Sequence, residues 1–322
     1  MYCRLFLKEI RIVIKYQTKE NLQQMQILTQ KLRDRVSVCE ADPAETLCAE
    51  KGDRIPGEGK KKKADFREGE APDRGILWLT DCAETARRLL EQGEALIFWL
   101  HEDNRDRNPG EVLFAVEEPG EADAEFFDRI YRRYREIPWV IAETERCIVR
   151  ESTEEDVESF VKIYGELQDA GYRVTEEFCH ESRQEREYVR KYIRKFYEIF
   201  GYGIWTVVWK DSGEVIGRVG FEHSSDEREE ALMLGYMTAL PWQRKGIAEE
   251  VCRAALSFAR AELEVCRIGV KIDAENVASL RLAQKLGFEG SYVTAENGSR
   301  QYLGSLAMTG FHVISETGIT KA

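Results

Sequence analysis

The chain has 322 residues, which is enough for about two domains of roughly 150 residues each. Hydrophobic residues make up 43% and charged residues 33%, and 59 acidic against 47 basic side chains give a formal net charge of -12. This balance argues against nucleic-acid binding, which needs a surplus of Lys and Arg to displace the counterions of phosphates. No stretch reaches the about 20 apolar residues of a spanning helix, so we expect a cytoplasmic protein without membrane partners.

Charge and composition divide the chain into three parts. Residues 1–75 hold 16 basic and 13 acidic residues, so their net charge is +3 and the remaining residues carry -15. We expect a polar helix at about 17–37 and a disordered linker over 39–75, which is rich in Gly, Glu, Lys and Pro and poor in aromatic residues. A small α/β accessory domain is predicted at 76–143, and a larger unit of strands and helices at 146–315.

The accessory domain begins with a strand–helix–strand pattern. Ile76–Asp81 and Ala95–Leu100 are apolar runs typical of buried strands, with a helical pattern between them. Asp81 follows the first strand, as the nucleophile does in haloacid-dehalogenase-type phosphatases, but Asp81-Cys82-Ala83 lacks the second carboxylate of their Asp-x-Asp signature. We interpret this part as resembling a reduced, non-catalytic relative of that fold, which serves as a substrate lid or a dimer surface. A homodimer is therefore a possible assembly, and phosphatase activity is the remote alternative.

The larger unit opens with a strand at 146–150 and a helix whose start has the capping-box residues Ser152 and Glu155. A second helical pattern carries aromatic residues from Tyr188 to Phe200, which are most simply core residues. A hairpin is predicted over 204–221, followed by a strand at 231–237.

The most informative stretch follows that last strand. Pro241 ends the strand, Gly246 permits a tight turn, and a new helical pattern begins directly afterwards. The first amides of a helix lack intrahelical partners and carry the positive end of its dipole, so they bind phosphates. Arg244 and Lys245 add positive charge within an acidic body. Strand, turn and helix start together predict a pyrophosphate site.

The segment Gln243-Arg244-Lys245-Gly246-Ile247-Ala248 resembles the loop Gln/Arg-x-x-Gly-x-Gly/Ala of the GNAT superfamily of acyl-CoA-dependent N-acetyltransferases. It lacks the Gly-Lys-Ser/Thr tail of a P-loop. The strand 268–272, the Asn-x-x-Ser motif at 276–279 and Lys285-Leu286-Gly287-Phe288 follow in the family's order, so the resemblance covers about 146–310. It implies an α/β (α+β) fold with a mixed sheet that splays near 231–237. It also implies acetyl-CoA as cosubstrate, no metal, and acetyl transfer to a primary amine by direct attack.

The same resemblance suggests roles for individual residues. A backbone N–H at Gly235 or Tyr236 would polarise the thioester carbonyl, and Glu222 is the first candidate for the base, with Glu230 second. Asn276 and Ser279 would contact the pantetheine arm or the thiol. The predicted catalytic residues are Glu222, Tyr236 and Asn276, and the predicted cofactor-binding residues are Met237, Gln243, Arg244, Lys245, Gly246, Ile247, Ala248, Asn276 and Ser279.

One departure from the family leaves an alternative open. Many members have a Tyr that protonates the departing thiolate, but the corresponding residue is Ala283. Tyr236, Tyr292 or Tyr302 could replace it, or the thiolate could leave unassisted. The alternative function is an acyl-CoA-binding sensor or scaffold with lost chemistry. The acceptor is expected to be a small-molecule amine or a protein or peptide amine. The dispersed His and Cys residues argue against a metal site and for free thiols.

Overall fold

The computed structural model describes residues 6–41, 75–107, 109–172, 182–197, 200–224, 230, 232–263, 265–295 and 298–308. The chain forms two compact units, 1–139 and 140–322. Most of the predicted linker, 42–74, lies outside the described residues. No helix in these ranges is long and apolar enough to cross a membrane.

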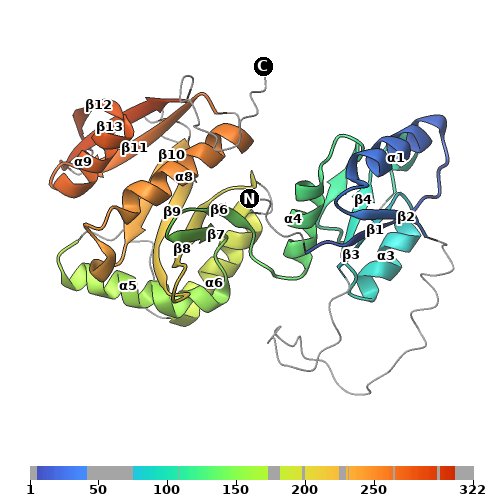
Figure 1. Ribbon diagram of the computed structural model, residues 1–322, viewed down its shortest axis with the longest axis horizontal. Helices are drawn as coiled ribbons and strands as arrows, with labels where there is room; N and C mark the ends of the chain where they lie inside the picture. Colours follow the sequence, from blue (N-terminus) through green and yellow to red (C-terminus); the bar gives the residue numbers. More distant parts are fainter. Residues whose placement is uncertain are drawn as a thin grey trace. The chain divides into compact units, whose positions relative to one another are not determined.

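The first unit is a five-stranded sheet with helices on both faces (Figure 1). Every strand pair is parallel, and the strand order is β2-β1-β3-β4-β5. The elements are β1 (Glu9–Val13), α1 (Lys19–Leu32), β2 (Ser37–Glu40), β3 (Ile76–Thr80), α3 (Ala83–Glu91), β4 (Leu96–Trp99), the 3-10 turn η2 (Glu102–Asn104), β5 (Ala115–Val116) and α4 (Ala124–Tyr134).

Alternation along the strands divides the apolar side chains of this sheet between two cores. On one face, Ile12 and Leu79 pack in a cluster with Leu28 of α1 and Phe127 of α4. On the other face, strand residues pack with Ala86 and Leu89 of α3. The sheet is therefore buried on both sides, which explains why β3 and β4 are continuous apolar runs.

The N-terminal boundary predicted for the accessory domain is corrected by this topology. β1 pairs with β3 over five residues, and β2, which includes Cys39 and Glu40 of the predicted linker, pairs with β1. The helix predicted at 17–37 is confirmed as α1. The strand at β1 was missed because Glu9 and Arg11 interrupt its apolar residues, although alternation turns Ile10 and Ile12 into the core.

The second unit is built around an eight-stranded mixed sheet of order β12-β13-β11-β10-β9-β8-β7-β6. Its 3-10 turns are η3 (Glu154–Asp156) and η5 (Leu240–Trp242), and η4 (Ile193–Tyr197) is a π-helix that continues α6. The other elements are β6 (Val140–Glu143), β7 (Cys147–Arg150), α5 (Val157–Asp169), α6 (Ser182–Tyr192), β8 (Ile204–Trp209), β9 (Val215–His223), β10 (Leu232–Thr238), α8 (Ile247–Glu262), β11 (Arg267–Asp273), α9 (Val277–Leu286), β12 (Glu289–Thr294) and β13 (Arg300–Ala307).

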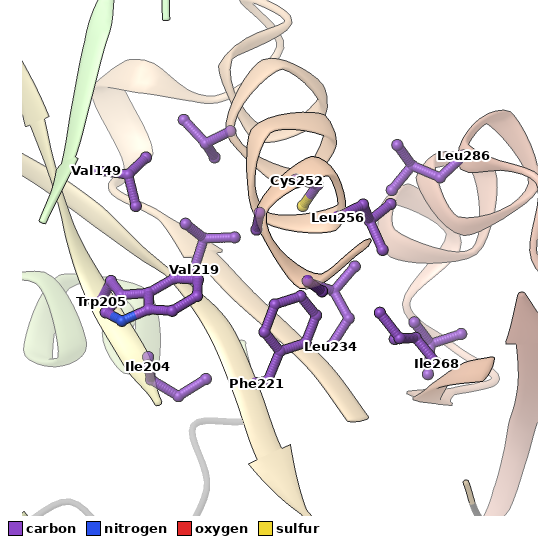
Figure 2. Close-up of a cluster of buried hydrophobic side chains, with 14 of the residues drawn as sticks. Val149, Ile204, Trp205, Val219, Phe221, Leu234, Cys252, Leu256, Ile268 and Leu286 are labelled. Carbon is purple, nitrogen blue, oxygen red and sulfur yellow. The ribbon is translucent and has the colours of Figure 1, made fainter. Parts of the chain in front are cut away.

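Helices cover both faces of this sheet as well. Figure 2 shows the core on one face, where Cys252 and Leu256 of α8 meet Phe221 and Leu234 of the central strands. On the opposite face, Phe160 of α5 belongs to a second cluster. The sheet thereby keeps its two faces distinct, so that a residue's place in the strand alternation decides which helices it contacts.

A tyrosine hydroxyl separates β7 from β8 where both strands end. The hydroxyl of Tyr197 accepts from the amide of Ser152 at 3.3 Å and donates to the carbonyl of Ile204 at 2.5 Å. The amide of Ile204 donates to the hydroxyl of Tyr192 at 2.6 Å. The π-helix η4 allows both tyrosines to reach β8, because its wider turn brings residues five apart, such as Tyr192 and Tyr197, to one side of the helix. The single α-helical pattern expected from Tyr188 to Phe200 therefore ends at Tyr192.

A buried carboxylate ties the N-terminal segment to the first unit. Asp128 accepts from the amides of Phe6 and Leu7, each at 2.7 Å, and from Arg132 at 2.7 Å. We expect Asp128→Ala to lower the free energy of unfolding of this unit by about 3–5 kcal/mol, because two backbone amides and a buried guanidinium would lose a common acceptor. Denaturant unfolding of the whole chain, read by hydrogen exchange in residues 6–41, measures the loss.

The matched control is Asp34→Ala, since Asp34 is an exposed carboxylate of the same unit. It should change the stability by less than about 0.5 kcal/mol. Equal unfolding midpoints for the two variants would contradict the role given to Asp128.

Candidate functional site

The sheet of the second unit forks between β10 and β11. Seven residue pairs join β10 to β9, whereas among the described residues Met233 and Gly269 form the one pair that joins β10 to β11. A Cβ at Gly269 would lie 2.4 Å from the sulfur of Met233, so the side chain of Met233 packs directly over this glycine at the closed end of the fork. Beyond Met233, the strands diverge and leave one edge of β10 open.

The strand alternation indicates which backbone groups face the opening. The amide of Ala239 donates to the carbonyl of Ile216, so odd-numbered residues of this segment turn their backbone groups toward β9. Tyr236 and Thr238 therefore turn theirs toward the fork. Of the two predicted candidates for polarising a thioester, Tyr236 presents its backbone N–H to the opening and Gly235 does not.

Glycines lower the sheet surface beside the fork. Gly235 lies opposite Gly220, which lies opposite Ile204, so the three share one row of the sheet. A Cβ at Gly235 would lie 3.2 Å from Ile204 Cδ1. Glu222 lies two residues beyond Gly220 on β9, so its side chain is on the same face of the sheet as this row, the face that α5 covers.

The loop after β10 is held in a conformation that exposes its amides. Arg244 and Gly246 have left-handed backbones with φ of 59° and 79°, and Gly246 caps α8 without a side-chain hydrogen bond. The amides of residues 244–249 donate to no acceptor in the part of the chain that the structure describes. Since the first turn of α8 also carries the positive end of its dipole, this loop can bind an anion.

Three side chains brace the loop from outside. Arg146, at the start of the sheet's β7, donates to the carbonyl of Lys245 at 2.9 Å and forms an ion pair with Glu250 of α8 at 2.7 Å. Burial opposes ionisation of Glu250, but hydrogen bonds from Thr144 and Arg146 outweigh it and lower its pKa. Gln243 donates to the carbonyl of Thr238 at 3.1 Å, so this predicted cofactor ligand uses its side chain to hold the turn.

The positive side chains of the loop are only partly free for a ligand. The ammonium group of Lys245 lies 4.9 Å from the ring centre of Trp242. The side chain of Ile247 is buried in the core. Ile247 and Ala248 can therefore contact a ligand through their backbone amides at the start of α8. What this loop can offer to a ligand therefore includes its backbone amides.

A bridge crosses from β10 to the start of α9. The hydroxyl of Tyr236 donates to the carbonyl of Ser279 at 3.2 Å, and the side chain of Asn276 caps α9 by accepting from the amide of Ser279 at 3.1 Å. The two predicted α9 residues and Tyr236 are thus in one network. Met237 is not part of it: its side chain packs with the α5 cluster, and its backbone faces β9.

The carboxylate candidates have different surroundings. Glu222 is exposed and lies opposite Met233, at the level where the sheet forks. Glu230 accepts from Arg267 at 2.8 Å and from Ser305 at 2.7 Å, and these hydrogen bonds lower its pKa. A base must accept a proton, so its lowered pKa makes Glu230 the weaker candidate.

The tyrosines proposed to replace the missing acid are constrained. Burial raises the pKa of Tyr236 far above its usual value, so its phenol stays protonated at neutral pH and transfers its proton reluctantly. Tyr302 donates to the carbonyl of Phe288, and Tyr292 lies under Arg300 on an exposed strand. Ala283 is fully buried. The hydroxyls of Tyr236 and Tyr302 are thus engaged with backbone carbonyls.

The accessory unit has its own buried carboxylate, Asp81, at the end of β3. It accepts from the amides of Lys15 and Tyr16 at 2.6 and 3.0 Å, and His101 lies 3.4 Å away. Asp81 therefore holds the segment after β1. Within the described ranges, no group of three or more His, Cys, Asp or Glu side chains could hold a metal.

Comparison with known proteins identifies the second unit. The family model "Acetyltransferase (GNAT) domain" matches residues 146–289. The uncharacterized N-acetyltransferase YoaA of Bacillus subtilis (strain 168) is 30% identical over 166 residues, which cover 51% of this chain and 88% of that protein. The uncharacterized protein YkkB of the same organism is 31% identical over 111 residues, or 34% of this chain and 64% of its own length. A solved putative GnaT-family acetyltransferase from Bordetella pertussis is 22% identical, with a TM-score of 0.43, over 52% of this chain and 98% of that chain.

The chain belongs to the GNAT acetyltransferase family. It is accordingly an acyltransferase, and its family uses acetyl-CoA. The family resemblance predicted from the loop and its flanking motifs is confirmed. Sequence reasoning missed Arg146, because its partners Lys245 and Glu250 lie about a hundred positions away and nothing in the local pattern signals the contact.

The brace on the loop can be tested without touching the loop itself. We expect Arg146→Met to raise the Kd for CoA roughly tenfold, because one charge-assisted hydrogen bond to the loop is lost. Isothermal titration with CoA measures this. Arg253→Met is the matched control, since Arg253 pairs with Glu249 on the exposed side of α8. An unchanged Kd for Arg146→Met would show that the loop holds its shape unaided.

Proposed function

We propose that this protein transfers an acetyl group from acetyl-CoA to a primary amine by direct attack within a ternary complex. The observation that carries the proposal is the fork itself: an open edge of β10 leads toward a loop whose amides at 244–249 lack acceptors in the described chain. The open edge of β10 can form hydrogen bonds with the extended, amide-containing pantetheine arm of CoA, and the amides of the loop can bind its pyrophosphate. The two parts of the site match the two parts of CoA.

The glycines and the loop geometry support the fit. Gly246 adopts a left-handed backbone and has no side chain that could cover the amides of the loop. The guanidinium of Arg146 lies 3.6 Å from where a Cβ at this position would be. Acetyl-CoA supplies the activated acyl group when bound. The backbone N–H of Tyr236 would donate to the thioester carbonyl, where negative charge develops as the amine adds.

Glu222 is the group we assign to proton removal. A protonated amine cannot attack, so the base must take one proton before or during formation of the C–N bond. The nitrogen lone pair then forms the bond to the acetyl carbon, the C–S bond breaks, and its electron pair leaves with sulfur. The second proton of the nitrogen passes to the departing thiolate, directly or through water, so that the products are the neutral amide and CoA thiol. CoA thiolate is a fair leaving group near neutral pH, which makes the absence of a tyrosine at Ala283 compatible with turnover.

The sensor alternative receives one observation in its favour, the buried Ala283. Family membership and the relatives named as N-acetyltransferases favour the enzyme. Release of CoA from acetyl-CoA in the presence of an amine panel decides between them, since a sensor would bind acetyl-CoA without turnover.

The proposed pyrophosphate-binding loop, residues 243–248, can be tested directly. Gly246→Asp should weaken CoA binding at least roughly tenfold, because a carboxylate would compete with the phosphates for the helix amides. Gly93→Asp is the matched control: Gly93 has a similar left-handed backbone, with φ of 74°, in the other unit. If both variants bind CoA like the unchanged protein, the loop is not the pyrophosphate site.

The base assignment can be tested separately from binding. Glu222→Gln should lower kcat by about 10²-fold or more while the Kd for acetyl-CoA stays the same, because general-base catalysis contributes about that much. Glu214→Gln, an exposed glutamate at the other end of the β8–β9 hairpin, is the control. A Glu222→Gln enzyme with full kcat would remove Glu222 from the mechanism.

A further inference from the structure

A methionine side chain closes the fork at its inner end. Met233 shares the α5 face of β10 with Gly235, since alternate residues of a strand lie on one face. Leu232 and Leu234 face the other way and belong to the core that α8 covers. A Cβ at Gly269 would lie 2.4 Å from the sulfur of Met233 and 3.1 Å from its Cε, so this side chain lies across the seam between β10 and β11.

Polar side chains hold the strands together at the same end. Glu230, which precedes β10, accepts from Arg267 of β11 at 2.8 Å and from Ser305 of β13 at 2.7 Å. Arg267 also donates to Ser305 at 2.6 Å. The closed end therefore has polar contacts of its own, and a substitution of Met233 changes the size of the side chain over the seam without removing them.

The Met233 side chain lies in line with the proposed donor. The loop 243–248 follows β10, so a pantetheine arm on the open edge of this strand runs from the loop toward Met233. Tyr236, whose N–H is proposed to bind the thioester carbonyl, is three residues from Met233, which is about 10 Å along a strand. An acyl group that continues in this direction has room for only a few carbons before it meets the thioether.

Met233 also lies beside the proposed base. Glu222 pairs with Met233 across β9 and β10, and the Cβ atoms of such a pair are about 5 Å apart on one face of the sheet. Gly235 contributes no side chain to this face. An amine that approaches over Gly235 can therefore reach both the thioester and Glu222, whereas an acyl chain that extends past Met233 would lie beside the base and obstruct the amine.

We propose that Met233 limits the length of the acyl group, so that the protein uses short acyl-CoA donors such as acetyl-CoA and excludes fatty acyl-CoA. This rests on the proposed acetyl transfer at the fork. Met233 is thus a specificity-determining residue for the donor. Its thioether is apolar and reaches across the seam, and a longer acyl chain would have to displace it from a space that it already fills.

Binding of two thioesters measures this limit without any acceptor. The whole protein is titrated calorimetrically with acetyl-CoA and with octanoyl-CoA. We expect the Kd for octanoyl-CoA to exceed that for acetyl-CoA at least roughly tenfold, which is the size of a typical overpacking penalty. Equal Kd values, or tighter binding of octanoyl-CoA, would overturn the inference.

Variants of Met233 connect the limit to this side chain. Met233→Ala should make octanoyl-CoA bind more tightly than acetyl-CoA, because the chain then enters an apolar space, and should leave the Kd for acetyl-CoA within roughly threefold. Met233→Leu is the matched control, since its similar volume should preserve the preference for acetyl-CoA. An unchanged ratio of the two Kd values in Met233→Ala would contradict the proposal.

A smaller change guards against a loss of folding. Met233→Val keeps a side chain suited to a strand and should lower the ratio of the two Kd values at least roughly threefold. Thermal unfolding of each variant shows that it is folded under the conditions of the titration. If Met233→Ala does not fold, an unchanged ratio in Met233→Val overturns the inference by itself.

Turnover distinguishes failure of this inference from failure of the transferase proposal. Release of CoA from both thioesters is followed with the amine panel that tests the proposed function. Equal kcat/KM for acetyl-CoA and octanoyl-CoA would overturn the limit at Met233 and leave acyl transfer standing. The expected Kd ratios without turnover of any amine would overturn acetyl transfer and leave the limit standing.

Discussion

The second unit depends on one constraint: backbone groups at the inner edge of a sheet need hydrogen-bond partners. Between β10 and β11, the pairing stops after Met233 and Gly269, and the strand beyond them keeps its exposed edge. Water or a ligand must therefore satisfy these groups. The hydroxyl of Tyr236 on β10 bonds to the carbonyl of Ser279 on α9, and the core shown in Figure 2 packs α8 against the central strands.

The same constraint holds for the loop 243–248, because the first amides of α8 have no acceptor among the described residues. A left-handed residue at Arg244 and another at Gly246 turn the chain so that successive amides point outward. Arg146 and Glu250 fix this turn to β7, and Gln243 fixes it to the end of β10. The loop thus contacts β7, which lies about a hundred residues earlier in the chain, in addition to β10 and α8, which flank it. Both halves of the candidate site consist mainly of backbone groups, whose capacity for hydrogen bonds does not depend on the net charge of the unit.

Much of this could be predicted from the sequence, and the remainder has identifiable physical causes. The loop 243–248 was predictable because glycine at a turn and an apolar helical period are local signals. Strand β1 was not, because its partner β3 begins more than sixty residues later and its burial depends on that pairing. The direction of the backbone groups of Tyr236 could not be read either, since alternation needs a fixed reference, here the bond from Ala239 to Ile216. The π-turn after Tyr192 replaces a helical period that looks unbroken in the sequence.

The sheet has a second place where two neighbouring strands separate, between β7 and β8, and there the hydroxyl of Tyr197 lies between them. In a continued ladder, the amide of Ser152 would donate to the carbonyl of Ile204; here, the phenol stands between them and bonds to both. Burial raises the pKa of Tyr197 to about 12, so the proton that the carbonyl needs is retained. The opening between β7 and β8 is thus closed by a side chain of the same protein, whereas beyond Met233 the edge of β10 pairs with no strand among the described residues.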